Sequence, residues 1–208
     1  MKRDRSIPTL AGRSLSILLH PTLIPFYAVA LLLLSDTLLS FADSSTKLFF
    51  AGSVAVNTIA IPAFCILLLR IFGILKGFTL ETPRERMLPL AVTVLCYAAS
   101  AWMLRDMPTV FLVRKFFTAA TACTLLCLVL TPFWKISLHM TAQGGMVALL
   151  LLLNIMGTEM LLLPFCCTIL FAGLLGSARL WLGAHTPAQI FAGFAAGFVL
   201  TTLIVLLV

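Results

Sequence analysis

Long apolar stretches separated by short polar segments make up most of the chain. The stretches are about 20 residues or longer, the length that a helix needs to cross roughly 30 Å of hydrocarbon. Because the apolar positions are continuous rather than alternating, the pattern predicts helices and not barrel strands. We expect an all-α, polytopic transmembrane helix bundle of about seven spans, with six as the alternative count. The predicted spans are 15–35, 48–74, 84–104, 110–133, 137–156, 160–182 and 187–208.

The polar residues at the start of the chain predict a simple domain organisation. A basic tail at 1–14 is expected to precede a single transmembrane helical domain at 15–208. The apolar stretch after the tail is longer than the core of a secretory signal and has no small-residue cleavage site. We therefore expect a retained first span.

Composition supports a membrane protein and argues against metal chemistry. The chain is 62% hydrophobic and 10% charged, where a soluble domain carries about 25% charged residues. All six cysteines lie inside apolar stretches without metal-ligand spacing, so we interpret them as packing residues. The three histidines fall in separate spans or span ends with no carboxylate cluster beside them. We expect no metal and no cofactor.

Two predicted spans begin with the same capping signal. Thr82-Pro83-Arg84-Glu85 and Thr186-Pro187-Ala188-Gln189 each offer a hydroxyl N-cap, a proline at the first helical position, and a Glu or Gln at the third. This combination is typical of a capping box with a proline start. Both helices should begin sharply, with free backbone N–H groups at their starts.

Counting membrane crossings places three polar segments on one side of the bilayer, which we call the site face. They are 76–86, 135–139 and 179–185, and the basic tail joins them. Ten of the fourteen Lys and Arg residues fall on this face, so the positive-inside rule predicts that it is cytoplasmic, in an inner or plasma membrane. Five of the ten belong to the candidate site, so this orientation depends on the tail. We interpret the tail as an orientation signal and a contact for anionic lipids, not as a nucleic-acid arm.

The residues on the site face suit an anionic substrate. Guanidinium groups bind phosphate oxygens as a fork, and helix N-termini favour anions. Histidine acts as a nucleophile or as a proton donor. In a membrane protein, the expected partners are the bilayer and a lipid phosphate; a homo-oligomer is possible but not indicated.

Three motifs on this face resemble the signatures of type 2 phosphatidic acid phosphatases. Ala178-Arg179 is followed after five intervening residues by His185, and after three more intervening residues by Gln189, which resembles Ser-Arg-x5-His-x3-Asp. Ile136-Ser137-Leu138-His139 resembles Pro-Ser-Gly-His, and the segment from Lys76 to Arg84-Glu85-Arg86 is similar to Lys-x6-Arg-Pro. The resemblance covers about 76–195 and indicates a divergent membrane branch of this superfamily.

The resemblance implies metal-independent phosphoryl transfer to or from a lipid phosphate or diphosphate. His185 would attack phosphorus and form a phosphohistidine, and His139 would protonate the leaving oxygen. Gln189 stands where the family has an aspartate that orients the nucleophile. The implied phosphate-binding residues are Arg179, Ser137, Arg84, Arg86 and Lys76. A glutamine oxygen accepts an imidazole N–H but cannot offset the charge of an imidazolium, which predicts slow or altered chemistry.

Other interpretations remain open. The chain could be a non-catalytic lipid-phosphate binder or transporter that keeps the anion pocket, or a structural membrane subunit. Arg179 could extend to headgroups, and Gln189 could serve only as a cap. Gly144 and Gly145 are expected to permit close helix packing.

Overall fold

The computed structural model describes residues 7–34, 43–74, 83–107, 110–157 and 161–208, and all regular structure within these ranges is helical. Six helices in this part of the chain are long and apolar enough to cross a membrane, which makes the protein a multi-pass integral membrane protein. The helices are α1 (Ile7–Leu18), α2 (Ile24–Leu34), α3 (Ser44–Ala55), α4 (Ile61–Ile71), α5 (Pro83–Met103), α6 (Phe111–Leu130), α7 (Leu138–Ile155), α8 (Leu162–Trp181) and α9 (Pro187–Leu207).

The first apolar stretch differs from its prediction. Instead of one continuous helix over 15–35, it forms α1 and α2 with a turn between them, and α1 already begins at Ile7 inside the expected tail. Pro21 lies in this turn, where proline cannot continue a helical hydrogen-bond ladder. Six long spans are therefore the count that the described residues support.

The second span is continuous from Ser44 to Ile71 but contains a π-helical turn at Val56–Ala60 between α3 and α4. Asp43 caps the start of α3, accepting a hydrogen bond from the backbone N–H of Thr46 at 3.0 Å. The π turn directly precedes α4, whose second residue is Pro62, and both features are typical sites of bends in long helices.

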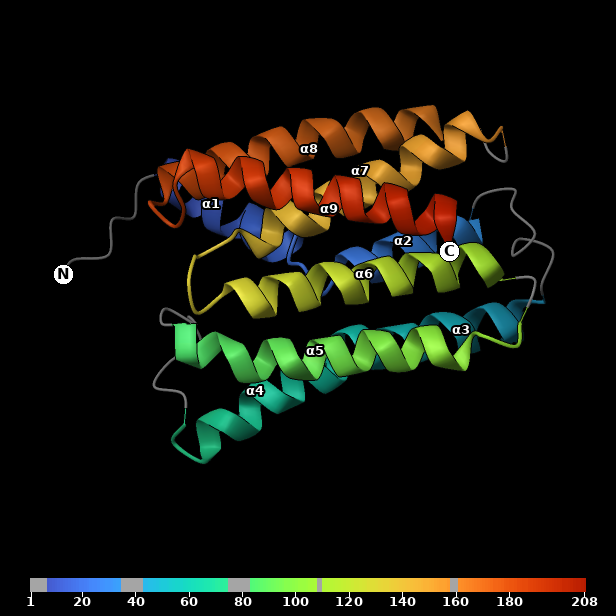
Figure 1. Ribbon diagram of the computed structural model, residues 1–208, viewed down its shortest axis with the longest axis horizontal. Helices are drawn as coiled ribbons and strands as arrows, with labels where there is room; N and C mark the ends of the chain where they lie inside the picture. Colours follow the sequence, from blue (N-terminus) through green and yellow to red (C-terminus); the bar gives the residue numbers. More distant parts are fainter. Residues whose placement is uncertain (1–6, 35–42, 75–82, 108–109, 158–160) are drawn as a thin grey trace.

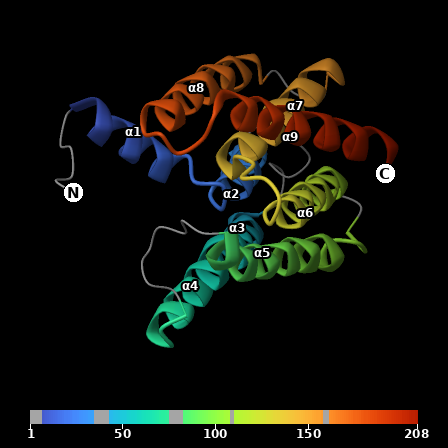
Figure 2. The same cartoon turned by 60° about the vertical axis from the view of Figure 1, so that its left-hand side comes forward.

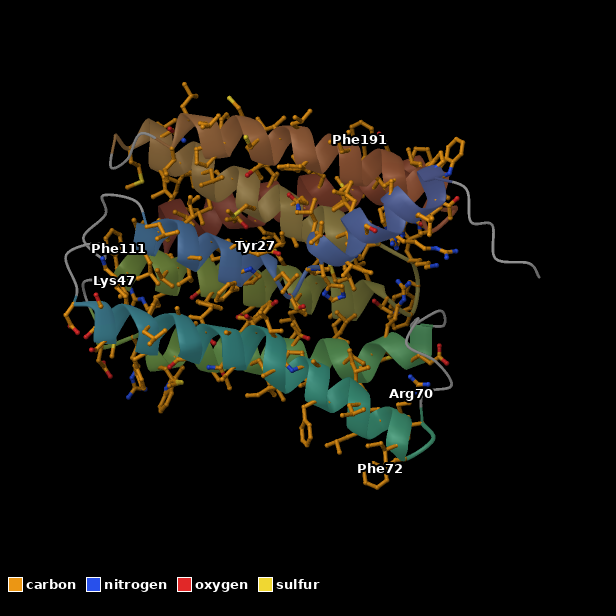
Figure 3. All side chains as sticks on the ribbon, turned by 180° about the vertical axis from the view of Figure 1, so that it is seen from behind. Tyr27, Lys47, Arg70, Phe72, Phe111 and Phe191 are labelled. Carbon is orange, nitrogen blue, oxygen red and sulfur yellow. The ribbon has the colours of Figure 1, made fainter. Side chains whose placement is uncertain are left out.

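The helices form two groups with α2 and α6 between them. Figure 2 shows α1, α7, α8 and α9 in one group and α3, α4 and α5 in the other. In Figure 1, the starts of α5, α7 and α9 and the end of α8 lie at the same end of the bundle, as the crossing count predicts. Lys47 and Phe111 lie at the opposite end from Arg70 (Figure 3).

Helix α7 is the centre of the bundle, and it packs directly against the backbone of α9. A Cβ atom added to Gly144 would collide with the carbonyl oxygen of Phe194, and one added to Gly193 would lie 2.7 Å from the carbonyl oxygen of Ser137. Small residues allow this close approach of two membrane helices. The predicted packing role of Gly144 is confirmed, and the contact at Gly193 brings the start of α7 against α9.

Candidate active site

His185 lies in the short connection between α8 and α9, and its surroundings determine which ring nitrogen carries hydrogen. Its Nδ1 atom lies 3.2 Å from the carbonyl oxygen of Lys135 and 3.3 Å from Oε1 of Gln189. Both oxygens can only accept, so Nδ1 is the donor to both and carries the hydrogen of the neutral ring. The lone pair of the imidazole is then on Nε2, the nitrogen that a nucleophilic histidine needs.

His185 is held in its neutral form. Burial and the nearby guanidinium of Arg179 lower the pKa of His185 to about 4, although the hydrogen bonds to Gln189 and Lys135 act in the opposite direction. Desolvation and a neighbouring positive charge both disfavour an imidazolium. At neutral pH the Nε2 lone pair is therefore unprotonated.

Gln189 has two roles that share one oxygen atom. It is the third residue of α9, and its Oε1 accepts the backbone N–H of Thr186 at 3.1 Å while the Thr186 hydroxyl accepts the N–H of Gln189. The predicted capping box at Thr186 is thus confirmed. The same Oε1 accepts Nδ1–H of His185, so the helix cap also orients the histidine.

His139 lies in the first turn of α7, and the N-cap of that helix is tied to α9. The backbone N–H of Ser137 donates to the carbonyl oxygen of Gln189 at 3.4 Å. His139 itself donates from Nε2 to the carbonyl oxygen of Ser16 at 3.0 Å, because a carbonyl oxygen can only accept. The two histidines therefore belong to helix starts that are hydrogen-bonded to each other.

Both histidines line one cavity of about 920 Å³. Among the described residues, its rim holds four cationic side chains and no carboxylate; the cations are Arg13, Arg86, Lys135 and Arg179. Its inner walls come from the middle of the bundle and include Leu90, Tyr97, Phe116, Ala120, Ala142 and Gly145. One end of the cavity is thus positively charged, and the other reaches the depth of the hydrocarbon.

Arg179 is a cation of this cavity with an unused hydrogen-bond donor. It lies in the last turn of α8, and its Nε is buried with no hydrogen-bond partner among the described residues. A buried donor of a charged group needs a partner. A phosphate oxygen in the cavity would supply one.

A protein-family model described as the PAP2 superfamily matches residues 91–208, more than half of the chain. The chain belongs to the PAP2 superfamily. The matched region contains Ser137, His139, Arg179, His185 and Gln189. Neither a curated protein nor a solved structure matches the chain.

Membership of the PAP2 superfamily indicates a phosphatase that acts on phosphate esters, and such phosphatases are generally metal-independent. Within the described residues, no group of three or more His, Cys, Asp or Glu side chains could hold a metal ion.

The remaining predicted site residues of this PAP2 protein lie in different places. Arg86 in α5 lines the cavity. Ser137 is fully buried as the N-cap of α7, does not line the cavity, and its Oγ has no partner among the described residues. Lys76, Thr82 and the side chain of Arg84 lie outside the part of the chain that the structure describes.

The structure also adds residues that sequence reasoning did not assign to the PAP2 site. Arg13 and His20 line the cavity from the α1–α2 segment, and the carbonyl oxygen of Lys135 holds His185. For His20 a signal existed, because a histidine-proline pair inside an apolar stretch marks a break where a polar side chain can face the interior. A backbone carbonyl such as that of Lys135 leaves no signal in the sequence.

Proposed function

We propose that this protein is a membrane phosphatase or phosphotransferase that acts on a lipid phosphate or diphosphate through a phosphohistidine at His185. The observation that carries this proposal is the single cavity that joins a cationic rim and two histidines to apolar walls at hydrocarbon depth. A phosphate at the rim would contact Arg179 while its hydrocarbon chain lies between the helices. A small soluble phosphate ester would not use the inner half of this cavity.

In the first step, the Nε2 lone pair of His185 attacks phosphorus and the bond from phosphorus to the ester oxygen breaks. Nδ1–H stays hydrogen-bonded to Gln189 and to the Lys135 carbonyl, which hold the ring in line. His139, doubly protonated at the start of this step, gives its Nδ1 proton to the departing oxygen and becomes neutral, so the alcohol leaves neutral. Arg179 stabilises the charge on the transferring phosphoryl group.

In the second step, water attacks the phosphohistidine. His139, now neutral, takes a proton from the water as the bond between phosphorus and Nε2 breaks. Inorganic phosphate leaves, and His185 returns to its neutral form with hydrogen on Nδ1. An acceptor alcohol in place of water would make the same site a phosphotransferase.

We propose that Gln189 replaces the aspartate of the third signature in a divergent branch. Its Oε1 supports this role, because it occupies the acceptor position toward Nδ1 of His185. A neutral amide gives less stabilisation to a positively charged imidazole than a carboxylate does. In a serine-protease triad, the corresponding loss of charge costs about 10⁴ in rate, with a wrong tautomer as the main cause. Here the tautomer is correct, so we expect a smaller loss.

We also propose that the site face is cytoplasmic. The tail residues Lys2, Arg3 and Arg5 precede α1, whose start lies at the same end of the bundle as the site. A basic segment beside the first membrane helix favours the cytoplasmic side.

The test uses the purified full-length protein in detergent micelles. Phosphate release would be measured for long-chain alkyl phosphates and diphosphates and for butyl phosphate, which has the same headgroup without the long chain. We expect a higher kcat/KM for the long-chain esters, complete loss in His185→Ala, and no change in Arg105→Ala at the opposite end of the bundle. Equal rates in the wild type and His185→Ala would overturn the catalytic role of His185.

A labelling experiment tests the alternative of a non-catalytic lipid-phosphate binder or transporter. Protein incubated with ³²P-labelled alkyl phosphate would be quenched in alkali, where phosphohistidine survives. Label on the wild type and its absence from His185→Ala supports the enzyme. Saturable binding of the ester, with neither label nor phosphate release, would establish the binder instead.

A further inference from the structure

We propose that His20, in the turn between α1 and α2, is a positioning residue that holds the imidazole of His139 in its working orientation. The proposal rests on the phosphatase function proposed above. It assigns a part of the site to a segment that lies before residues 91–208, the region matched by the family.

The α1–α2 segment is docked where it can reach the site. A Cβ atom added to Gly12 would lie 3.5 Å from Cβ of Ala178 and from the side chain of Leu182, so α1 packs closely against the end of α8. This contact sets α1 beside Arg179. The chain then leaves the helix after Leu18 and carries His20 and Thr22 along the cavity wall.

His139 is held from two sides by this segment. Its Nε2–H donates to the Ser16 carbonyl at 3.0 Å. Its ring also meets the ring of His20 edge to face, with centroids 5.5 Å apart and planes at 84°. Ring pairs favour this geometry. The ring of His20 therefore lies directly beside the imidazole of His139.

The ring of His20 is itself fixed. Its Nδ1 lies 3.4 Å from the backbone N–H of Thr22, which can only donate, and 2.8 Å from the Thr22 hydroxyl. Nδ1 is therefore the acceptor, and the hydrogen of the neutral ring is on Nε2. These hydrogen bonds within the turn favour one orientation of the His20 ring, the one that packs against His139.

The orientation of His139 matters because only one of its nitrogens can serve the reaction. Nε2–H is committed to the Ser16 carbonyl, so the proton that reaches the leaving oxygen must come from Nδ1 of the doubly protonated ring. A flipped ring would turn Nε2 away from the Ser16 carbonyl and leave that carbonyl without its donor. We therefore expect loss of His20 to impair proton donation more than phosphate binding.

The test compares two six-carbon phosphate esters that differ in their need for an acid. Hexyl phosphate requires protonation of the departing alkoxide, whereas 4-nitrophenyl phosphate releases a stable anion without it. In His20→Ala we expect kcat/KM for hexyl phosphate to fall about 10- to 100-fold, part of the contribution of a general acid. We expect kcat/KM for 4-nitrophenyl phosphate to stay within about threefold, because kcat/KM reports only the steps up to release of the leaving group.

Two further variants separate positioning from folding. His20→Phe keeps a flat ring against His139 and should restore most of the activity on hexyl phosphate. Tyr27→Phe removes the hydrogen bond of 2.9 Å from the Tyr27 hydroxyl to the carbonyl oxygen of Leu18 in the same broken segment, and should affect both esters equally or not at all. An equal loss on both esters in His20→Ala, or no loss on either, would overturn the role of His20. A wild-type protein that hydrolyses neither of these esters nor the long-chain alkyl phosphates would instead overturn the phosphatase function itself.

Discussion

Oε1 of Gln189 lies 3.3 Å from Nδ1 of His185 and 3.1 Å from the backbone nitrogen of Thr186, so one amide oxygen caps α9 and orients the histidine. The helix start and the proposed nucleophile cannot move independently. A change at Gln189 therefore tests the cap and the chemistry together, and the choice of substitution decides which one is disturbed.

Gln189→Glu should increase turnover. Glutamate has the same reach as glutamine and is a regular partner in a capping box, so the cap is kept. Its negative charge would stabilise the positive imidazole that forms with the phosphohistidine, and we expect kcat to rise by about tenfold or more. Steady-state hydrolysis of an alkyl phosphate measures the effect. Gln189→Leu, which removes both acceptor functions, should lower kcat; a rate for Gln189→Glu at or below that of the wild type would contradict the orienting role.

The pH dependence of the reaction should follow His185. Burial, together with Arg179, lowers the pKa of His185 to about 4, so the neutral nucleophile persists down to that pH and is lost as the pH falls through it. We therefore expect kcat/KM to fall as the pH drops through about 4, where His185 becomes protonated. In Gln189→Glu the added charge raises the pKa of His185, and this fall should move to higher pH. Comparing the two profiles on one substrate cancels the ionisation of the phosphate ester.

Arg179→Lys should weaken phosphate binding although it keeps the charge. Lysine lacks the fork of donors and has no counterpart to the buried Nε. Charge-assisted hydrogen bonds contribute about 1.5–3 kcal/mol, which corresponds to a rise of about 10- to 100-fold in the inhibition constant of inorganic phosphate or vanadate. Arg105→Lys is the control, since Arg105 pairs with Asp106 at 3.1 Å at the other end of the bundle. Equal inhibition constants for wild type and Arg179→Lys would remove Arg179 from the phosphate site.

Gly193→Ala should lower both stability and activity. The new Cβ would lie 2.7 Å from the Ser137 carbonyl oxygen and push the start of α7 away from α9. Overpacking of this kind costs about 1–3 kcal/mol, which a lower Tm in detergent would reveal. Gly173→Ala in α8 is the matched control, because nothing lies within 4 Å of its Cβ position. If both variants melt alike, the close contact is not needed.

The sequence predicted those parts of the fold and site that depend on local spacing. The positions of Arg179, His185 and Gln189 follow from a helix end, a short turn and a capping box, all within eleven residues. The common face of the helix starts followed from counting apolar stretches. The interruption near Pro21 was not predicted as a break, because the apolar stretch around it is long enough for one span.

Other features depend on contacts between distant segments and could not be read from sequence. The Lys135 carbonyl that holds His185 and the Ser16 carbonyl that holds His139 are backbone atoms, which every residue carries. For Ser137, the place in a signature predicts a phosphate contact. The structure puts this residue at the N-cap position of α7 with its hydroxyl buried, and the phosphate contact stays a prediction.

The hydrogen bond between Ser16 and His139 joins positions 123 residues apart, and this has a consequence for biogenesis. Helix α1 leaves the ribosome early, and the Ser16 carbonyl lacks its His139 partner until α7 is inserted. An unpaired acceptor in an apolar environment is costly, so the docked position of α1 is less stable until α7 has been made. The later half of the chain thus helps to determine whether α1 keeps its final position. A nascent chain truncated before α7 should fail to hold α1 there.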